Sequence, residues 1–247
     1  MQTGGAMAKV HTTWKVLEHG PLQQLAENLW RVEGALPGMS LRRTMTVVRR
    51  ADGSLLLHSP IALDDARQRE LEALGPIAVL VVPNAGHRLD APAYKGRYPQ
   101  AALFCPRGGR EKIADVVTVD ATYDDYADDG TVRFETLDGV AEGEGALIVR
   151  SEDGVTVVLN DAVMNMDKKR DVLGYLFTTV LGSAPGPRVS RLARLVYVKD
   201  QPALRQHLER LAELPNLQRL IVSHEKVASG PEAAAALRQA ATYLKAG

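Results

Sequence analysis

The residues best suited to chemistry in this sequence follow directly after short apolar runs. Asn84 and His87 come after "VLVVP", Asp161 after "VVLN" and His224 after "LIVS", while His58 ends the run "LLLH". Imidazole and carboxylate groups bind divalent metals and transfer protons. Sites in layered α/β proteins are assembled from loops beyond strand ends. We therefore expect these residues to lie around a shared cleft.

Each residue taken singly also has an ordinary explanation, because turns, helix caps and surface positions use the same residue types. Asp90 suits the cap of a following helix. Glu142 and Glu144 precede the apolar run "GALIV" and could add a carboxylate, although exposed loop glutamates are more common. The recurrence of suitable residues at successive strand ends is what favours a site.

The elements that must hold these residues are short strands alternating with helices. Asp52-Gly53 and Asp153-Gly154 are typical of tight hairpins. We expect a mixed α/β (α+β) fold in which helices cover mixed sheets. Strands are predicted at 44–48, 54–58, 78–82, 101–105, 116–120, 132–136, 145–149, 154–160 and 217–223, and helices at 64–75, 168–182, 202–214 and 230–247.

Composition excludes several kinds of site and partner. Thirty basic and thirty acidic residues give the 247-residue chain no net charge, so we expect neither nucleic acid nor membrane as a partner. The short basic clusters, such as Arg42-Arg43 and 168–170, are interpreted as solvated faces. Cys105 is the single cysteine, which excludes an intrachain disulfide and a thiolate zinc site. No signal peptide is evident, so a cytoplasmic location is the default expectation.

Other catalytic motifs find little support. The sequence contains no GxxxxGK[ST] phosphate loop, no GxGxxG after a strand and no GxSxG nucleophile elbow. A nucleotide-binding role for "VVPNAGH" is therefore a minor alternative.

Four phrases, in this order, resemble the metallo-β-lactamase superfamily: "LLLHSP", "EALGPIAVLVVPNAGHRLDAPAYKGRYPQAALFCP", "GVTVVLNDAVMNM" and "LQRLIVSHEKV". The resemblance runs from about Leu29 to the C-terminus. It implies a four-layer αββα sandwich, with residues 29–247 as one domain and residues 1–28 as an extension packed on it. The chain looks closest to a branch with a degenerate metal-binding motif.

The degeneracy lies in the HxHxDH motif of that superfamily, which corresponds here to "NAGHRLD". Asn84 stands in place of the first histidine, and the second falls on Gly86 or its neighbour His87. Arg88 and Leu89 replace the Asp-His pair. The resemblance therefore implies too few strong ligands for two metals, since Asn is a weak donor for zinc.

The remaining family ligands map onto later parts of the chain. The bridging aspartate matches Asp161 and the last histidine matches His224, whereas the early strand that usually ends in aspartate ends here in His58. Around Glu142 to Glu144 another family histidine is replaced. The implied metal ligands are His87, Asp161 and His224, with Glu142, Glu144 and His58 as weaker candidates.

The resemblance implies a mononuclear metal-dependent hydrolase of ester or amide-type bonds, with one divalent ion, zinc, or none. Asp161 and His87 are the expected catalytic residues, and Asn84, Arg88 and Lys95 are expected to bind an unidentified small-molecule substrate. The alternative is a non-enzymatic ligand-binding or scaffold protein that has lost its metals. A homodimer is left open.

Overall fold

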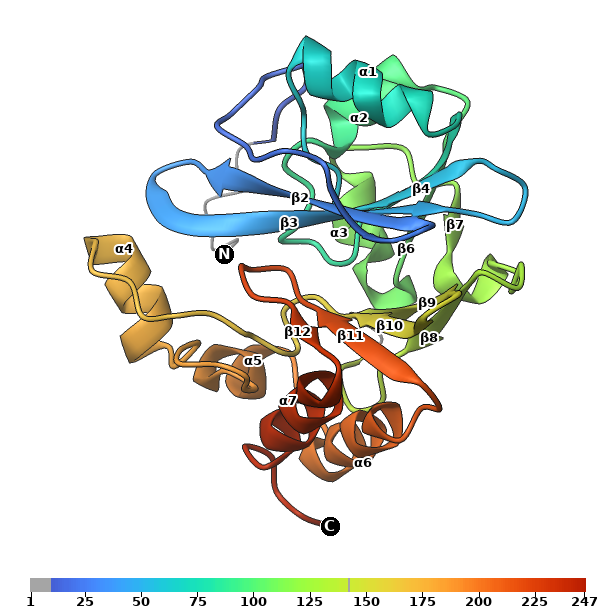
Figure 1. The fold of residues 1–247 in the computed structure, drawn as a ribbon. Coiled ribbons are helices and arrows are strands. Elements are labelled where there is room, and N and C mark those ends of the chain that lie inside the picture. Colours follow the sequence, from blue (N-terminus) through green and yellow to red (C-terminus); the bar gives the residue numbers. More distant parts are fainter. Residues whose placement is uncertain (1–9, 142) are drawn as a thin grey trace.

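Two β-sheets stack face to face in the computed structural model, which describes residues 10–141 and 143–247 (Figure 1). The first sheet has the strand order β1-β2-β3-β4-β5-β6-β7. Pairing is antiparallel from β1 to β4 and parallel from β4 to β7. Its strands are β1 (Gln23–Ala26), β2 (Leu29–Leu36), β3 (Met39–Arg49), β4 (Leu55–His58), β5 (Ile77–Val81), β6 (Ala102–Cys105) and β7 (Ala121–Thr122).

The second sheet has the order β12-β11-β10-β9-β8. Here β10 and β11 are parallel, and the other neighbours are antiparallel. Its strands are β8 (Val132–Thr136), β9 (Gly145–Ser151), β10 (Gly154–Val158), β11 (Leu217–Ile221) and β12 (Ala228–Ser229).

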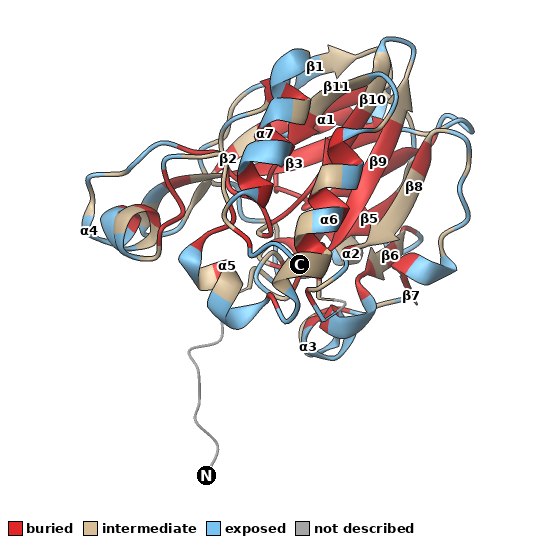
Figure 2. Cartoon of the chain, turned by 90° about the horizontal axis from the view of Figure 1, so that it is seen from below, coloured by how far each residue is buried: buried red, intermediate tan, exposed pale blue. Residues whose placement is uncertain are grey.

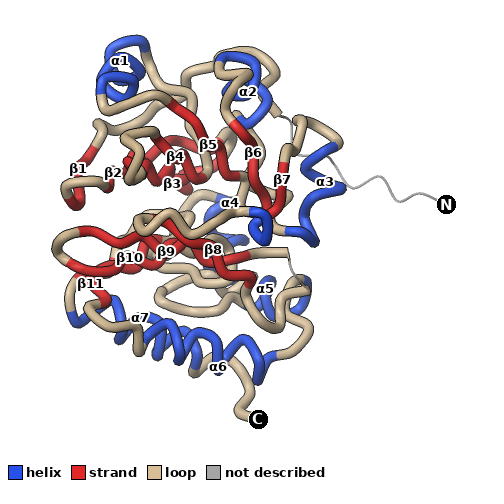
Figure 3. Tube along the Cα trace, turned by 90° about the vertical axis from the view of Figure 1, so that its right-hand side faces the viewer, coloured by secondary structure: helices blue, strands red, loops and turns tan. Residues whose placement is uncertain are grey.

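Helices cover the outer face of each sheet, which gives the four layers seen edge-on in Figure 3. Helices α1 (Asp65–Ala73) and α2 (Ala91–Arg97) lie over the first sheet, and α6 (Gln201–Ala212) and α7 (Pro231–Ala241) over the second. Helix α3 (Arg110–Ala114) lies beside β7 at one end of the sandwich and contributes Ile113 to the core of the first layer. The remaining helices, α4 (Val172–Tyr175), the π-helical turn η3 (Leu176–Val180) and α5 (Arg191–Val196), lie to one side of the sandwich. Two short 3-10 turns complete the set, η1 (Arg107–Gly109) and η2 (Tyr123–Asp125).

Successive side chains along a strand point to opposite faces of the sheet, so each strand contributes apolar side chains to the cores on both of its faces. Leu55 and Leu57 pack under the helices of the first sheet, whereas Leu56 between them packs against the second sheet. In the second sheet, Ile148 faces the α6 and α7 layer and Leu147 faces the first sheet. Figure 2 shows the resulting buried strands beneath exposed outer helix faces.

The expected fold class is confirmed: the chain is an αββα sandwich of mixed sheets. Both Asp-Gly pairs lie in antiparallel hairpins, β3–β4 and β9–β10. The strand predicted at 116–120 is wrong, because Val116 and Val117 follow α3 in a turn and Val117 packs into the core from there. The helix predicted at 168–182 is shorter than expected and spans α4 and η3. The sequence patterns do not predict β1, β2, β7, β12 or α5.

The described residues before β2, from residue 10 onward, pack on the first layer. The backbone of His11 donates to the carbonyl of Leu89 at 2.7 Å, and the indole of Trp14 donates to the carbonyl of Leu63 at 2.9 Å. The division between residues 28 and 29 stays a prediction. None of the described helices is long and apolar enough to cross a bilayer.

Candidate metal and active site

Three side chains from separate loops converge at one edge of the sandwich. His87, Asp161 and His224 each offer a ligand atom, and these atoms lie within 4.8 Å of one another. The imidazole Nε2 of His87 lies 3.1 Å from Oδ1 of Asp161, and Nε2 of His224 lies 3.7 Å from the same oxygen. Two imidazoles and a carboxylate therefore surround one point.

The sheet topology explains this convergence. His87 follows β5, and Asp161 and His224 follow the parallel pair β10 and β11. Parallel strands deliver the residues after their carboxyl ends to a common edge. The residues after two strand-end histidines, Ser59 and Glu225, have φ values of 58° and 64°, which non-glycine residues rarely adopt. Such backbone turns are typical of functional loops.

Asp161 is fixed by hydrogen bonds on both carboxylate oxygens. The hydroxyl of Ser223 donates to Oδ1 at 3.0 Å, and the amide of Asn84 donates to Oδ2 at 2.8 Å. Burial raises the pKa of this carboxyl, but the neighbouring His87 and His224 outweigh burial and hold the pKa well below its usual value. Asp161 is therefore an anion at neutral pH.

The two histidines are oriented so that one nitrogen of each faces Asp161. Nδ1 of His224 lies 2.7 Å from the carbonyl oxygen of Arg42, an acceptor, so Nδ1 carries the proton. In the neutral ring Nε2 then has its lone pair free. Nδ1 of His87 lies 3.4 Å from the hydroxyl of Ser59. Such bonds to the second nitrogen are usual for histidines that bind metals.

Asn84 is saturated by hydrogen bonds. Its amide donates to Asp161 and to Oε1 of Glu144 at 2.7 Å, and its oxygen accepts from the backbone of Gly86 and His87 at 2.7 and 3.1 Å. An amide with both donors and both acceptor positions in use has no free lone pair for a metal. Asn84 therefore links two carboxylates at the position where the resemblance puts a histidine.

Glu144 lies behind this link and is buried, with 2% of its surface exposed. It accepts from Asn84, from the backbone of Asp161 at 3.1 Å and from the backbone of Ala162 at 2.7 Å. Burial, together with the nearby Asp161 charge, raises the pKa of Glu144 to about 8. Its role in this structure is to hold the loop that carries Asp161.

A cavity of about 190 Å³ opens over the cluster. His87, Asp161, His224, Ser59 and Gly86 form its polar floor. Its remaining walls are largely apolar and come from the β2–β3 hairpin, the loop after β5 and η3. These wall residues are Leu36, Met39, Leu41, Arg43, Leu89 and Phe177.

Arg43 is the basic residue that lines this cavity, and the sequence did not indicate that it would lie there. The sequence predicts a solvated Arg42-Arg43 pair, which is wrong for Arg43: this residue is buried, and its guanidinium lies 2.6 Å from Oδ2 of Asp90. Asp90 occupies the N-cap position of α2 but makes no side-chain cap bond there. It instead pairs with Arg43 and with Nδ1 of His11 at 2.6 Å. A buried arginine is not distinguishable from an exposed one by residue type alone.

Other predicted site residues lie apart from the cluster. Arg88 donates to the carbonyl of Lys112, and Lys95 binds Asp120 and a backbone carbonyl, so neither lines the cavity. His58 is buried beneath the site, where burial and the nearby His87 lower its pKa to about 3. Glu142 lies outside the described residues. The roles assigned to these residues in binding substrate or metal remain predictions.

Besides Arg43, the polar site residues that the sequence patterns do not reveal are Ser59 and Ser223. Both stand next to strand-end histidines, in "LLLHSP" and "LIVSHEK", so their adjacency to a predicted ligand was the available signal. Each contacts a member of the cluster.

The donor set fits a single divalent ion. Two neutral imidazoles and one carboxylate are a common set of three protein ligands in catalytic zinc sites, which keep another position open. The open side here is the cavity. The saturation of Asn84 and the absence of a side chain on Gly86 leave no comparable set for a second ion among the described residues.

Comparison with solved structures identifies the fold. The DIM-1 metallo-β-lactamase exposed to ceftazidime superposes with a TM-score of 0.61 at 12% identity, covering 93% of this chain and 99% of that one. A metallo-β-lactamase from Pontibacter korlensis gives 0.59 at 10% identity, over 90% and 98%. VMB-1 gives 0.59 at 11% identity, over 90% and 96%. No protein-family model and no curated protein sequence matches the chain. The chain has the metallo-β-lactamase fold.

Proposed function

We propose that this protein is a mononuclear metal-dependent hydrolase that cleaves an ester or amide-type bond in a small molecule with an apolar group. The convergence of His87, Asp161 and His224 at the floor of a cavity carries this proposal. A divalent ion bound there, zinc by its ligand preference, supplies Lewis acidity toward water and a carbonyl oxygen.

The chain's own residues contribute orientation and charge. Asp161 brings a negative charge, held in place by Ser223 and Asn84. His224 is fixed through its bond to the Arg42 carbonyl. The apolar walls bind an apolar substituent and exclude water from the scissile bond, where a dry environment strengthens electrostatic interactions.

Arg43 adds a positive charge at the cavity wall. Its partner Asp90 neutralises much of that charge, with the two groups 2.6 Å apart. We therefore expect a substrate that is neutral or carries a single negative charge. This role replaces the one predicted for Arg88 and Lys95 as the substrate-binding cations.

A metal-free ligand-binding protein is the second candidate, and one observation favours it. Asp161 already accepts from Asn84 and Ser223 and contacts His87, so its carboxylate is satisfied without an ion. In that case the cavity would bind the same apolar ligand without cleaving it.

Metal content separates the two candidates. The full chain, purified without a histidine tag, is dialysed against zinc and its metal is measured by mass spectrometry. We expect about one equivalent in the wild type and less than a tenth in His87→Ala, Asp161→Ala and His224→Ala. His19→Gln is the matched control, because His19 lies outside the cavity and should keep its equivalent.

Activity is then screened with a panel of aryl esters, anilides and a cephalosporin, the last because one structural neighbour was exposed to ceftazidime. Metal binding with zinc-dependent turnover supports the hydrolase. A wild-type protein that binds no zinc after dialysis, or turnover that is unchanged in all three alanine variants, would refute the hydrolase proposal.

A further inference from the structure

The exposed apolar surface of this protein is concentrated in one segment. Nine large apolar side chains are exposed in the part of the chain that the structure describes, and eight of them belong to α4, η3, α5 and the residue after α5. Val172 and Leu195 are the most exposed, at 84% and 83%. We call this set the side patch: Val172, Leu173, Tyr175, Leu176, Val180, Leu195, Val196 and Tyr197.

The polarity of α4 and η3 is reversed relative to a helix facing water. Gly174 and Thr178 are buried against the protein, and the hydroxyl of Thr178 donates to the Gly174 carbonyl at 2.7 Å. The outward positions instead carry large apolar residues such as Leu173 and Leu176. Surface helices of soluble domains bury their apolar stripe, so this arrangement indicates a surface that is covered in use.

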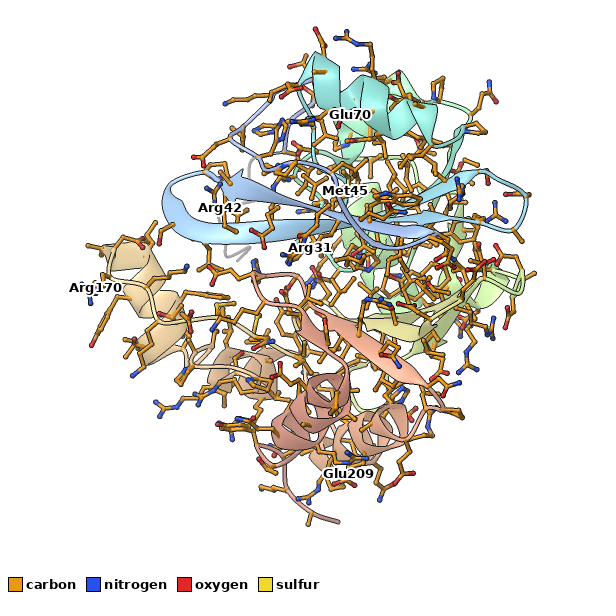
Figure 4. The ribbon with its side chains drawn as sticks, in the orientation of Figure 1. Arg31, Arg42, Met45, Glu70, Arg170 and Glu209 are labelled. Carbon is orange, nitrogen blue, oxygen red and sulfur yellow. The ribbon has the colours of Figure 1, made fainter. Side chains whose placement is uncertain are left out.

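Basic residues flank the same segment. Residues 167–200 contain seven lysines or arginines and three acidic residues, in a chain whose total charge is zero. Lys168, Arg170, Arg191 and Lys199 are exposed, and no described carboxylate forms an ion pair with them. Figure 4 shows Arg170 at the outer end of α4, away from the sandwich. The net charge of the whole chain therefore conceals a basic side.

We propose that the side patch docks on an anionic lipid surface. Apolar side chains enter the interfacial region of a bilayer, and flanking Lys and Arg residues bind anionic headgroups. A second copy of the chain is the less favourable occupant, since an isologous contact would bring the same uncompensated basic residues face to face. This peripheral docking needs no membrane-spanning helix and differs from the expectation based on net charge.

The docking surface is joined to the cavity. Phe177 in η3 lies between exposed patch residues, lines the cavity and packs with its ring centroid 6.1 Å from that of His224. Docking would bring this cavity wall to the lipid. The inference stands on the side patch alone and does not depend on metal binding or hydrolysis.

Vesicle sedimentation tests the proposal with the full chain. We expect binding to equimolar phosphatidylglycerol and phosphatidylcholine vesicles, weak binding to pure phosphatidylcholine, and a decline with added salt. Lys168→Glu with Arg170→Glu should lower the partition coefficient at least about tenfold, because each of these basic residues is attracted to anionic headgroups. Val172→Asp with Leu195→Asp should lower it at least about tenfold by removing apolar contacts.

Matched controls separate the side patch from total charge. Arg69→Glu with Lys245→Glu makes the same charge change at exposed positions on α1 and near the C-terminus, and should bind within about twofold of wild type. Val16→Asp is the control for the apolar substitutions, because Val16 is the large exposed apolar residue of the described chain that lies outside the side patch. Unchanged circular dichroism shows that each variant folds.

Three outcomes would overturn the proposal. The first is no more binding to phosphatidylglycerol vesicles than to pure phosphatidylcholine. The second is equal loss in the control double variant, which would assign binding to net charge. The third is a dimer, observed by sedimentation velocity, that the double variant Val172→Asp with Leu195→Asp converts to a monomer while vesicle binding stays unchanged. This result would mean that the side patch binds a second copy of the chain.

Discussion

At the scale of single residues, the site depends on small groups that hold the ligands. Ser223 donates one hydrogen bond to Asp161 and fixes the orientation of the oxygen that faces both histidines. Groups in this position commonly change metal affinity without binding the metal themselves. We expect Ser223→Ala to weaken zinc binding about tenfold while leaving the stoichiometry at one.

Isothermal titration with a competing chelator measures this affinity. Ser229→Ala is the control, because Ser229 lies at the far end of the β11–β12 pairing, opposite Arg219 and not at the cavity. Equal affinity in Ser223→Ala and wild type would mean that Asp161 needs no orientation by this hydroxyl.

At the scale of elements, a buried ion pair ties β3 to the loop before α2. Asp90 accepts from Arg43 at 2.6 Å and from the backbone of Ala62 at 3.0 Å, and has no exposed side-chain surface. Removing one partner of such a pair leaves an uncompensated buried charge. We expect Asp90→Ala to lower the free energy of unfolding by about 3–5 kcal/mol.

The double variant Arg43→Met with Asp90→Ala isolates the pair from the other bonds of Asp90. Urea denaturation should show a loss smaller than the sum of the two single losses, with a coupling of about 1 kcal/mol or more. Strictly additive losses would show that the pair contributes only packing.

A second prediction at this scale concerns the contact between β8 and α6. The bond from His207 lowers the pKa of Glu135 to about 2 despite partial burial, with Arg210 and Arg133 also contributing. Asp138 faces the other nitrogen of His207. Because the folded pKa lies below the ordinary value of 4.5, this stabilisation is complete above about pH 4.5 and disappears as pH falls toward 2.

Glu135→Gln should therefore be less stable than wild type by about 1–2 kcal/mol at pH 7, allowing for solvent screening. The difference should shrink as the pH falls from 4.5 to 3, as measured by urea denaturation at each pH. Glu70→Gln is the control, since Glu70 forms a solvent-accessible ion pair with Arg67 and its removal should change little. A difference independent of pH would exclude the ionic origin.

At the scale of the whole molecule, one bound ion would connect both sheets. His87 follows a strand of the first sheet, and Asp161 and His224 follow strands of the second. A ligand that binds only the folded state, present at a concentration a hundred times its dissociation constant, raises the free energy of unfolding by about 2.7 kcal/mol. For a chain of this size we expect zinc to raise the melting temperature by about 5–10 °C.

Differential scanning fluorimetry with and without zinc measures this shift. Asp161→Ala should abolish it and His19→Gln should retain it. A shift of equal size in Asp161→Ala would show that zinc stabilises the fold elsewhere.

Local patterns in the sequence predicted most of the strands and the polar residues that follow them. The apolar run Leu55, Leu56 and Leu57 indicates a strand that is buried on both faces, and the Asp-Gly pairs indicate two hairpins. These are local properties, because they depend on neighbours along the chain. The order of four phrases sufficed to predict the αββα arrangement, whereas the β-branched run at 116–120 misled because tertiary packing overrode its local preference.

The details of the site and of the surface depend on contacts between distant parts of the chain. Arg43 is buried beside Asp90, while Arg170 in an equally basic sequence is exposed. The saturation of Asn84 depends on Glu144 and Asp161, which lie 60 and 77 residues away along the chain. Burial and hydrogen bonding between distant residues are set by how the layers stack, and no local pattern encodes that stacking.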